Sequence, residues 1–138
     1  MAGPYVCSAT HLRIRGPLQV LPFLWASLRA SIAARRTPGV RRVRLLGFPL
    51  LPVYLTLTVW ESEEALLRFV KTPQHRVAMA GFERWTGAGK FVRFTSETPR
   101  VTWRQAFAAL RDPDGTYRRG VGYWRRGQQP ATGPSTTA

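Results

Sequence analysis

The order in which strand-like and helix-like patterns follow one another constrains the fold of this chain more than any other feature. Alternation of apolar and polar residues indicates strands, and apolar residues spaced by three and four indicate amphipathic helices. The patterns run strand, helix, strand, strand, a helix in two pieces and strand, over residues 5–14, 21–36, 40–46, 54–60, 62–82 and 90–95. This β-α-β-β-α-β order predicts an α+β, ferredoxin-like domain with a four-stranded antiparallel sheet and helices on one face.

The first predicted helix gathers its large apolar side chains on one stripe, as an amphipathic helix does. The stripe consists of Leu18, Leu21, Trp25, Leu28 and Ile32. Proline is unfavourable inside a helix but is tolerated in the first turn, so Pro22 predicts that the regular helix begins near Leu21. The Thr-Pro-Gly turn at residues 37–39 ends it.

Residues 54–60 form the strongest strand pattern, because β-branched and aromatic residues fill the run. Leucine and valine occupy the odd-numbered positions, whereas Tyr54 and Trp60 point to the opposite face with two threonines between them. Both faces are therefore expected to be at least partly buried. No predicted helix remains to cover the face of Tyr54 and Trp60, so we expect a second copy of the chain to pack there. This predicts a homodimer.

The chain ends in an additional helix and a basic tail. Thr102 and Gln105 match a capping box that begins a short helix, and the turn at residues 112–115 stops it. We expect one domain over residues 1–115, which suits a chain of 138 residues. Residues 116–138 contain four Arg and no acidic residue, and we expect them to form a largely disordered tail.

Charge indicates a second class of function. The chain has 21 Lys and Arg against seven Asp and Glu, and residues 1–60 contain eight Arg and no acidic residue. An aromatic-Arg-Arg-Gly unit occurs at 117–120 and again at 124–127, a pattern that suits phosphates and stacked bases as well as a membrane interface. A binding module for nucleic acid or an anionic membrane is therefore the alternative to an enzyme. An Arg-rich composition with a solvated tail explains the same features without a partner.

Several kinds of chemistry are excluded because their motifs are missing. The sequence has no P-loop, no dinucleotide-binding glycine fingerprint and no Gly-x-Ser-x-Gly elbow. Cys7 is the single cysteine, and with two histidines it does not make a structural zinc site. No strong targeting segment is evident, so a cytoplasmic location is expected, with peripheral attachment to a membrane as the alternative.

His75 is the titratable residue in the most informative position. It shares a helix face with Met79 and Phe82, so its imidazole is expected to point to the interior. It is then either an axial ligand of a haem iron or a general base facing a pocket. A histidine at the helix margin with a purely structural hydrogen bond is the third interpretation.

Other candidate site residues lie on the predicted strands. Arg42, Arg44 and Arg93 are candidate anchors for haem propionates or an anionic substrate, unless they simply face solvent. The candidate walls of a pocket for an apolar substrate are Trp60, Met79, Phe91 and Phe94.

Several stretches resemble a known superfamily. The run Thr-Leu-Thr-Val-Trp-Glu-Ser-Glu-Glu-Ala-Leu at 56–66, followed by Phe69-Val70 and His75-Arg76-x-x-Met79, resembles dimeric α+β-barrel proteins of the antibiotic-biosynthesis-monooxygenase type. The motif Pro-x-x-Thr-Trp-x-x-Ala at 99–106 is similar to an uncharacterised branch of that superfamily. Pro38-Gly39, the Leu-Leu-Gly at 45–47 and Val59-Trp60 resemble junctions of the carotenoid-oxidising spheroidene monooxygenases. The resemblance covers about residues 5–110.

This resemblance implies both a fold and a function. It implies a dimeric α+β barrel and a monooxygenase-like oxidoreductase, whose apolar, polyketide-like or carotenoid-like substrate lies between sheet and helices. The carotenoid-oxidising relatives are associated with haem, whereas other relatives are oxygenases without a cofactor. The implied cofactor is therefore either a haem, with His75 as its ligand, or none.

Overall fold

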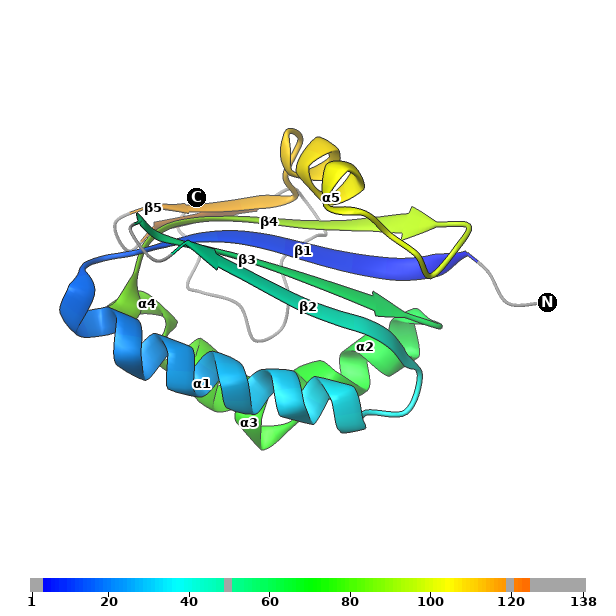
Figure 1. Cartoon of the computed structure of the whole chain (residues 1–138), viewed down its shortest axis with the longest axis horizontal. Helices are drawn as coiled ribbons and strands as arrows, with labels where there is room; N and C mark the ends of the chain where they lie inside the picture. Colours follow the sequence, from blue (N-terminus) through cyan, green and yellow to red (C-terminus); the bar gives the residue numbers. More distant parts are fainter. Residues whose placement is uncertain (1–3, 49–50, 119–120, 125–138) are drawn as a thin grey trace.

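A twisted antiparallel sheet separates two unequal sets of helices in the computed structural model, which describes residues 4–48, 51–118 and 121–124. In Figure 1, α1 to α4 lie below the sheet and α5 lies above it. In chain order the elements are β1 (Tyr5–Ile14), α1 (Pro17–Arg36), β2 (Val40–Phe48), β3 (Leu51–Trp60), α2 (Glu63–Val70), α3 (Pro73–Ala80), α4 (Phe82–Trp85), β4 (Thr86–Ser96), α5 (Trp103–Leu110), β5 (Gly115–Arg118) and β6 (Val121–Trp124).

The described strands pair in the order β2-β3-β1-β4-β5-β6. The first four reproduce the predicted β-α-β-β-α-β domain, and β1 lies at its centre, antiparallel to both β3 and β4. The predicted α+β, ferredoxin-like fold is therefore confirmed. The predicted four-stranded sheet is extended, because β5 pairs with β4 and β6 pairs with β5.

These two added strands correct the boundary predicted for the tail. Residues 115–118 and 121–124, assigned mainly to the tail, belong to the sheet. Tyr117 is 1% exposed and meets the ring of Phe82 edge-on, with centroids 4.8 Å apart, so an apolar anchor draws this segment into the core. Residues 119–120 and 125–138, which hold most of the Arg-Arg-Gly repeats, lie outside the described residues.

Helix α1 is longer than predicted. It begins at Pro17 and contains Pro22, rather than beginning near Leu21. The ring of Pro22 removes one hydrogen bond, to the carbonyl of Leu18. Because Leu18 lies in the first turn and is exposed, water can satisfy that carbonyl, and the helix tolerates the proline.

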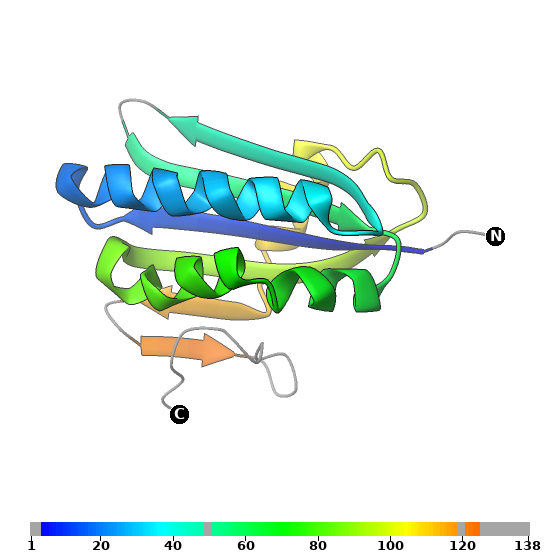
Figure 2. The same ribbon diagram turned by 90° about the horizontal axis from the view of Figure 1, so that it is seen from below.

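Capping residues position the helices that follow β3. The side chain of Ser62 accepts a hydrogen bond from the Ala65 N–H and begins α2. The side chain of Thr72 accepts one from the His75 N–H and begins α3, with Pro73 as its first residue. The predicted capping box of Thr102 and Gln105 is present at the start of α5. Figure 2 shows α1 lying beside α2 and α3 across one face of the sheet.

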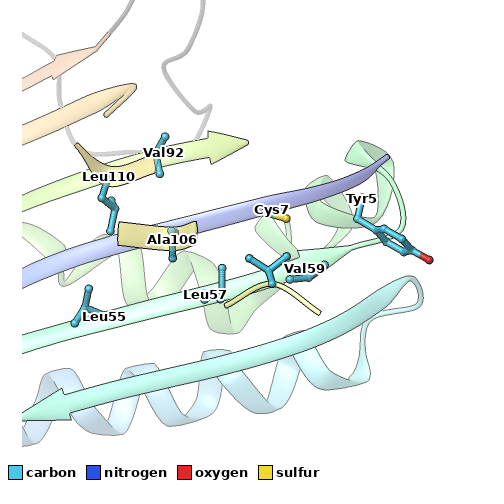
Figure 3. Packing of buried hydrophobic residues seen from close by; sticks show 10 residues of the cluster. Tyr5, Cys7, Leu55, Leu57, Val59, Val92, Ala106 and Leu110 are labelled. Carbon is cyan, nitrogen blue, oxygen red and sulfur yellow. The ribbon is translucent and has the colours of Figure 1, made fainter. Parts of the chain in front are cut away.

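The two faces of β3 are covered by different helices. Leu57 and Val59 join Cys7 and Ala9 of β1 in an apolar cluster that α5 closes with Ala106 and Leu110 (Figure 3). Tyr54 and Trp60 point the other way, toward α1 and α2, where they contact Phe23 and Phe69. The face expected to be uncovered is thus the face beneath the helices. The argument given for a homodimer is wrong on this point, and the homodimer itself stays a prediction.

Candidate functional site

A cavity of about 220 Å³ lies between the sheet and the helices α1 and α3. Its floor is polar, because β1 contributes Ser8 and Thr10 and the neighbouring β3 contributes Thr56 and Thr58. Strand register places Ser8 opposite Thr58 and Thr10 opposite Thr56. The hydroxyl oxygens of Thr10 and Thr56 are hydrogen-bonded to each other. Four hydroxyls of the sheet therefore face one largely apolar space.

Small side chains of α1 leave room for this cavity. The α1 residues that line it beyond Phe23 are Ala26, Ser27, Ala30, Ser31 and Ala34. Their spacing by three and four residues places them on one side of the helix, above the hydroxyl floor. The large apolar residues of the stripe predicted from sequence lie on the other side of the helix and face solvent.

His75 lines the cavity from α3. Its ring meets Phe69 edge-on, with centroids 5.0 Å apart, and its Nδ1 atom is buried without a hydrogen-bond partner among the described residues. Burial lowers the pKa of His75 from 6.5 to about 4, partly offset by a backbone hydrogen bond at Val70. The imidazole is therefore neutral at pH 7, and among the described residues its buried Nδ1 has no hydrogen-bond partner.

Three charged residues, Arg44, Arg93 and Asp114, also border the cavity. Arg93 of β4 lies on the same sheet face as the hydroxyl floor, and its Nη1 atom is 3.7 Å from Oε1 of Glu63 at the start of α2. The backbone N–H of Arg93 donates a hydrogen bond of 2.7 Å to Oδ2 of Asp114. Arg93 is thus a predicted anchor that the fold brings to the cavity that His75 also lines.

The predicted pocket walls divide between two faces. Phe91 and Met79 line the cavity, as the prediction proposed. Trp60 is fully buried and stacks on Phe69, with ring centroids 5.4 Å apart, in the layer beside the cavity. Phe94 packs against the cluster under α5, because residues of β4 alternate between faces and Phe94 is an odd number of positions from Phe91.

The predicted haem-binding set does not come together. Arg42 donates a hydrogen bond of 3.1 Å to the carbonyl of Val101, in the cluster on the α5 side. Arg44 borders the cavity, but its guanidinium lies over the ring of Trp103, 6.0 Å from the centroid. Two of the three predicted propionate anchors are therefore directed away from His75, so the residues present do not fit a haem.

Sequence reasoning missed the hydroxyl floor and the small residues of α1. The sequence predicts Thr56 and Thr58 on an uncovered face, and the serine and threonine of β1 belong to no recognised motif. The detectable signal was their alternation, because two paired strands each place hydroxyl residues on one face.

Comparison with solved structures places this geometry in a class. The fold is shared with antibiotic-biosynthesis-monooxygenase-like proteins, so the resemblance predicted from sequence is confirmed at the level of fold. One antibiotic biosynthesis monooxygenase superposes with a TM-score of 0.59 at 14% identity, covering 67% of this chain and 99% of that chain. PA3566 from Pseudomonas aeruginosa gives 0.63 at 12% identity, covering 71% and 99%.

Within that class, SnoaB from Streptomyces nogalater is a cofactor-independent oxygenase. It superposes with a TM-score of 0.58 at 18% identity, and the match covers 70% of this chain and 96% of SnoaB. No protein-family profile matches the sequence. No curated protein sequence matches it either. Among the described residues, no helix is both long and apolar enough to cross a membrane.

Proposed function

We propose that this chain is a monooxygenase-like oxidoreductase that oxidises an apolar substrate in the cavity, without a bound cofactor. The observation that carries the proposal is His75, a neutral imidazole with an unpartnered Nδ1 in the wall of an apolar cavity whose floor is lined with hydroxyls. The shared fold with SnoaB, a cofactor-independent oxygenase, supports the same reaction class. Because the predicted anchors do not fit a haem, no step is assigned to one.

The cavity favours a compact substrate over an extended one. At about 220 Å³ it is smaller than the roughly 300–1,000 Å³ of sites for drug-sized ligands. Phe23, Phe82 and Phe91 supply apolar and aromatic walls, and the floor supplies hydrogen bonds to one or two oxygen atoms. A fused-ring, polyketide-like compound suits this space better than a long carotenoid-like chain.

The reaction needs a substrate that reduces oxygen itself. His75 removes a proton from a ring methylene activated by a carbonyl with which it is conjugated through the fused rings, and the electron pair of the C–H bond forms the conjugated enolate. The enolate passes one electron to O₂, and the two radicals combine to form a C–O bond. The peroxide takes the proton from His75, then loses water as its O–O bond and the second C–H bond break. One methylene and one O₂ give one ketone and one water.

The surroundings of His75 assist both halves of this step. A hydroxyl of the floor donates a hydrogen bond to the enolate oxygen as its negative charge develops. The imidazolium formed then lies beside that anion, and this pairing raises the pKa of His75 above its value in the empty cavity. A residue that is neutral at rest becomes a competent base when an acidic substrate is bound.

Oxygen uptake with anthrone, a tricyclic ketone with an acidic ring methylene, tests the proposal. The purified chain should accelerate O₂ consumption and yield anthraquinone in a ratio of one to one. The His75→Ala variant should lose the enzymatic rate by about 100-fold or more, as expected for loss of a general base.

His11 provides the matched control. It is the other histidine of the chain and lies on β1, where its side chain points away from the hydroxyl floor because its neighbours Thr10 and Leu12 line the cavity. His11→Ala should keep the wild-type rate. If His75→Ala and His11→Ala are both folded by circular dichroism and His75→Ala reacts as fast as wild type, His75 has no role in the reaction.

A further inference from the structure

Helix α1 has two apolar faces of opposite character. Its small residues and Phe23 face the cavity, whereas the large apolar residues of the stripe, Leu18, Leu21, Trp25, Leu28 and Ile32, are exposed. Their exposure falls from 87% at Leu18 to 41% at Ile32. A run of five exposed large apolar residues along one helix is far more than the scattered single residues of an ordinary surface. This face is therefore built to be covered.

Arginines flank the exposed stripe. Arg29 follows Trp25 by four residues, and Arg35 and Arg36 follow Ile32 by three and four. These spacings keep the guanidinium groups on the same side of the helix as the stripe. The three arginines are exposed, and no acidic residue occurs in residues 1–60 to neutralise them locally. The surface is thus apolar along its centre and positive at its margin.

A basic groove adjoins the end of the stripe. The groove, of about 530 Å³, is lined by Ile32 of the stripe and by Arg29, Arg36 and Arg68, and none of its described lining residues is acidic. Arg68 donates a hydrogen bond of 3.3 Å from Nη2 to the carbonyl of Pro38, which holds its guanidinium at this position. Three guanidinium groups around one hollow are suited to phosphate oxygens.

We propose that α1 docks the protein on the surface of an anionic lipid bilayer. The stripe inserts at the boundary between headgroups and acyl chains, with the helix lying parallel to the surface, and the groove of Arg29, Arg36 and Arg68 receives lipid phosphates. Trp25, at the centre of the stripe, is of the type that concentrates at membrane interfaces. This docking is independent of the chemistry proposed for the cavity.

The positive charge beside the stripe favours an anionic bilayer over a second copy of the chain as the occupant of this surface. A symmetric contact through the stripe would bring Arg29, Arg35 and Arg36 of two copies together without acidic partners on α1. An anionic bilayer instead offers opposite charge at the margin and an apolar layer at the centre. The docked orientation also places the cavity on the side of α1 away from the lipid.

Sedimentation with lipid vesicles tests the docking of the full chain. Vesicles of phosphatidylcholine alone are compared with vesicles that contain phosphatidylglycerol, and we expect binding to the anionic vesicles that weakens as salt screens the charges. The double variant Leu21→Ser, Trp25→Ser should bind the anionic vesicles more weakly than wild type, by a factor of about ten or more. Arg29→Gln and Arg36→Gln should each weaken binding about fivefold.

Matched controls come from α5, on the opposite face of the sheet. Phe107→Ser removes an exposed aromatic residue, and Arg104→Gln removes an exposed charge. Both should bind anionic vesicles as wild type does. As a second measurement, brominated lipids should quench the fluorescence of wild type more than that of Trp25→Phe.

Three results would overturn the proposal. The first is wild-type protein that stays in the supernatant with anionic vesicles. The second is a stripe variant that binds as tightly as wild type, which would assign the binding to another surface. The third is a dimer in lipid-free solution that the stripe variant abolishes, which would identify a second copy as the occupant. Loss of anthrone turnover without loss of vesicle binding would affect only the proposed function.

Discussion

At the scale of single residues, His75 links folding to the proposed chemistry. Thr72 accepts a hydrogen bond of 3.3 Å from its backbone N–H and fixes its place in the first turn of α3. Phe69 packs against its ring, and its Nδ1 is buried at the cavity. Protonation would place a charge where neither water nor a described partner reaches that nitrogen. The residue should therefore leave a signature in the pH dependence of stability.

We predict that the free energy of unfolding depends on pH through His75. Burial lowers its pKa from 6.5 to about 4, so the unfolded chain takes up a proton at a higher pH than the folded chain. The contribution to stability is complete above pH 6.5 and is lost as the pH falls toward 4, by an amount of the order of 2 kcal/mol.

Urea unfolding of wild type and His75→Leu at about pH 7.5 and about pH 4.5 measures this term. The variant should lose less stability on acidification than wild type does. The pKa of His11 is also lowered, mainly by burial. Because His11 is present in both proteins, its contribution to the pH dependence of stability cancels in the comparison. An equal loss in the two proteins would contradict the burial of the His75 ring.

The residue-level predictions succeeded where a local signal fixed the orientation. Thr72 and Pro73 set the start of α3, and so the direction of His75 could be read from the sequence. Arg42 and Phe94 had no such signal. Alternation along a strand indicates which residues share a face. Which of the two faces borders the cavity depends on the helices that cover them, and the strand pattern does not predict that.

At the scale of elements, α1 determines how much space the cavity has. Apart from Phe23, its residues that line the cavity are alanines and serines, so the helix lies above the sheet without filling the gap. The sequence revealed the stripe of large residues but not its direction. Periodicity alone cannot distinguish a stripe that packs on the sheet from one that faces away, because both have the same spacing.

We predict that Ala30→Leu closes the cavity. Alanine and leucine are both good helix formers, so the change adds volume toward the hydroxyl floor without disturbing α1. Anthrone turnover should fall by more than about tenfold while the thermal midpoint is maintained, because filling a void does not remove packing contacts. The control Ala108→Leu lies exposed on α5 and should leave turnover unchanged. Normal turnover by Ala30→Leu would place the reaction elsewhere.

At the scale of the whole molecule, one sheet supports two separate interiors. The α5 side is a closed apolar cluster around Leu57 and Val59, whereas the α1 side contains the cavity. The order of elements predicted the central four strands. It did not predict β5 and β6, because these four-residue strands lie in a basic segment whose main apolar anchor, Tyr117, gives no periodic pattern.

Oxidation of anthrone under ¹⁸O₂ tests the central claim, that the cavity is a cofactor-free oxygenase site, most directly. The protein is treated with a chelator, and product formation is compared in wild type and His75→Ala by mass spectrometry. We expect wild type to form anthraquinone rapidly, with ¹⁸O as the new carbonyl oxygen, and the variant to react only at the slow rate seen in buffer. Product that carries oxygen from water, or wild-type protein no faster than buffer, would contradict it.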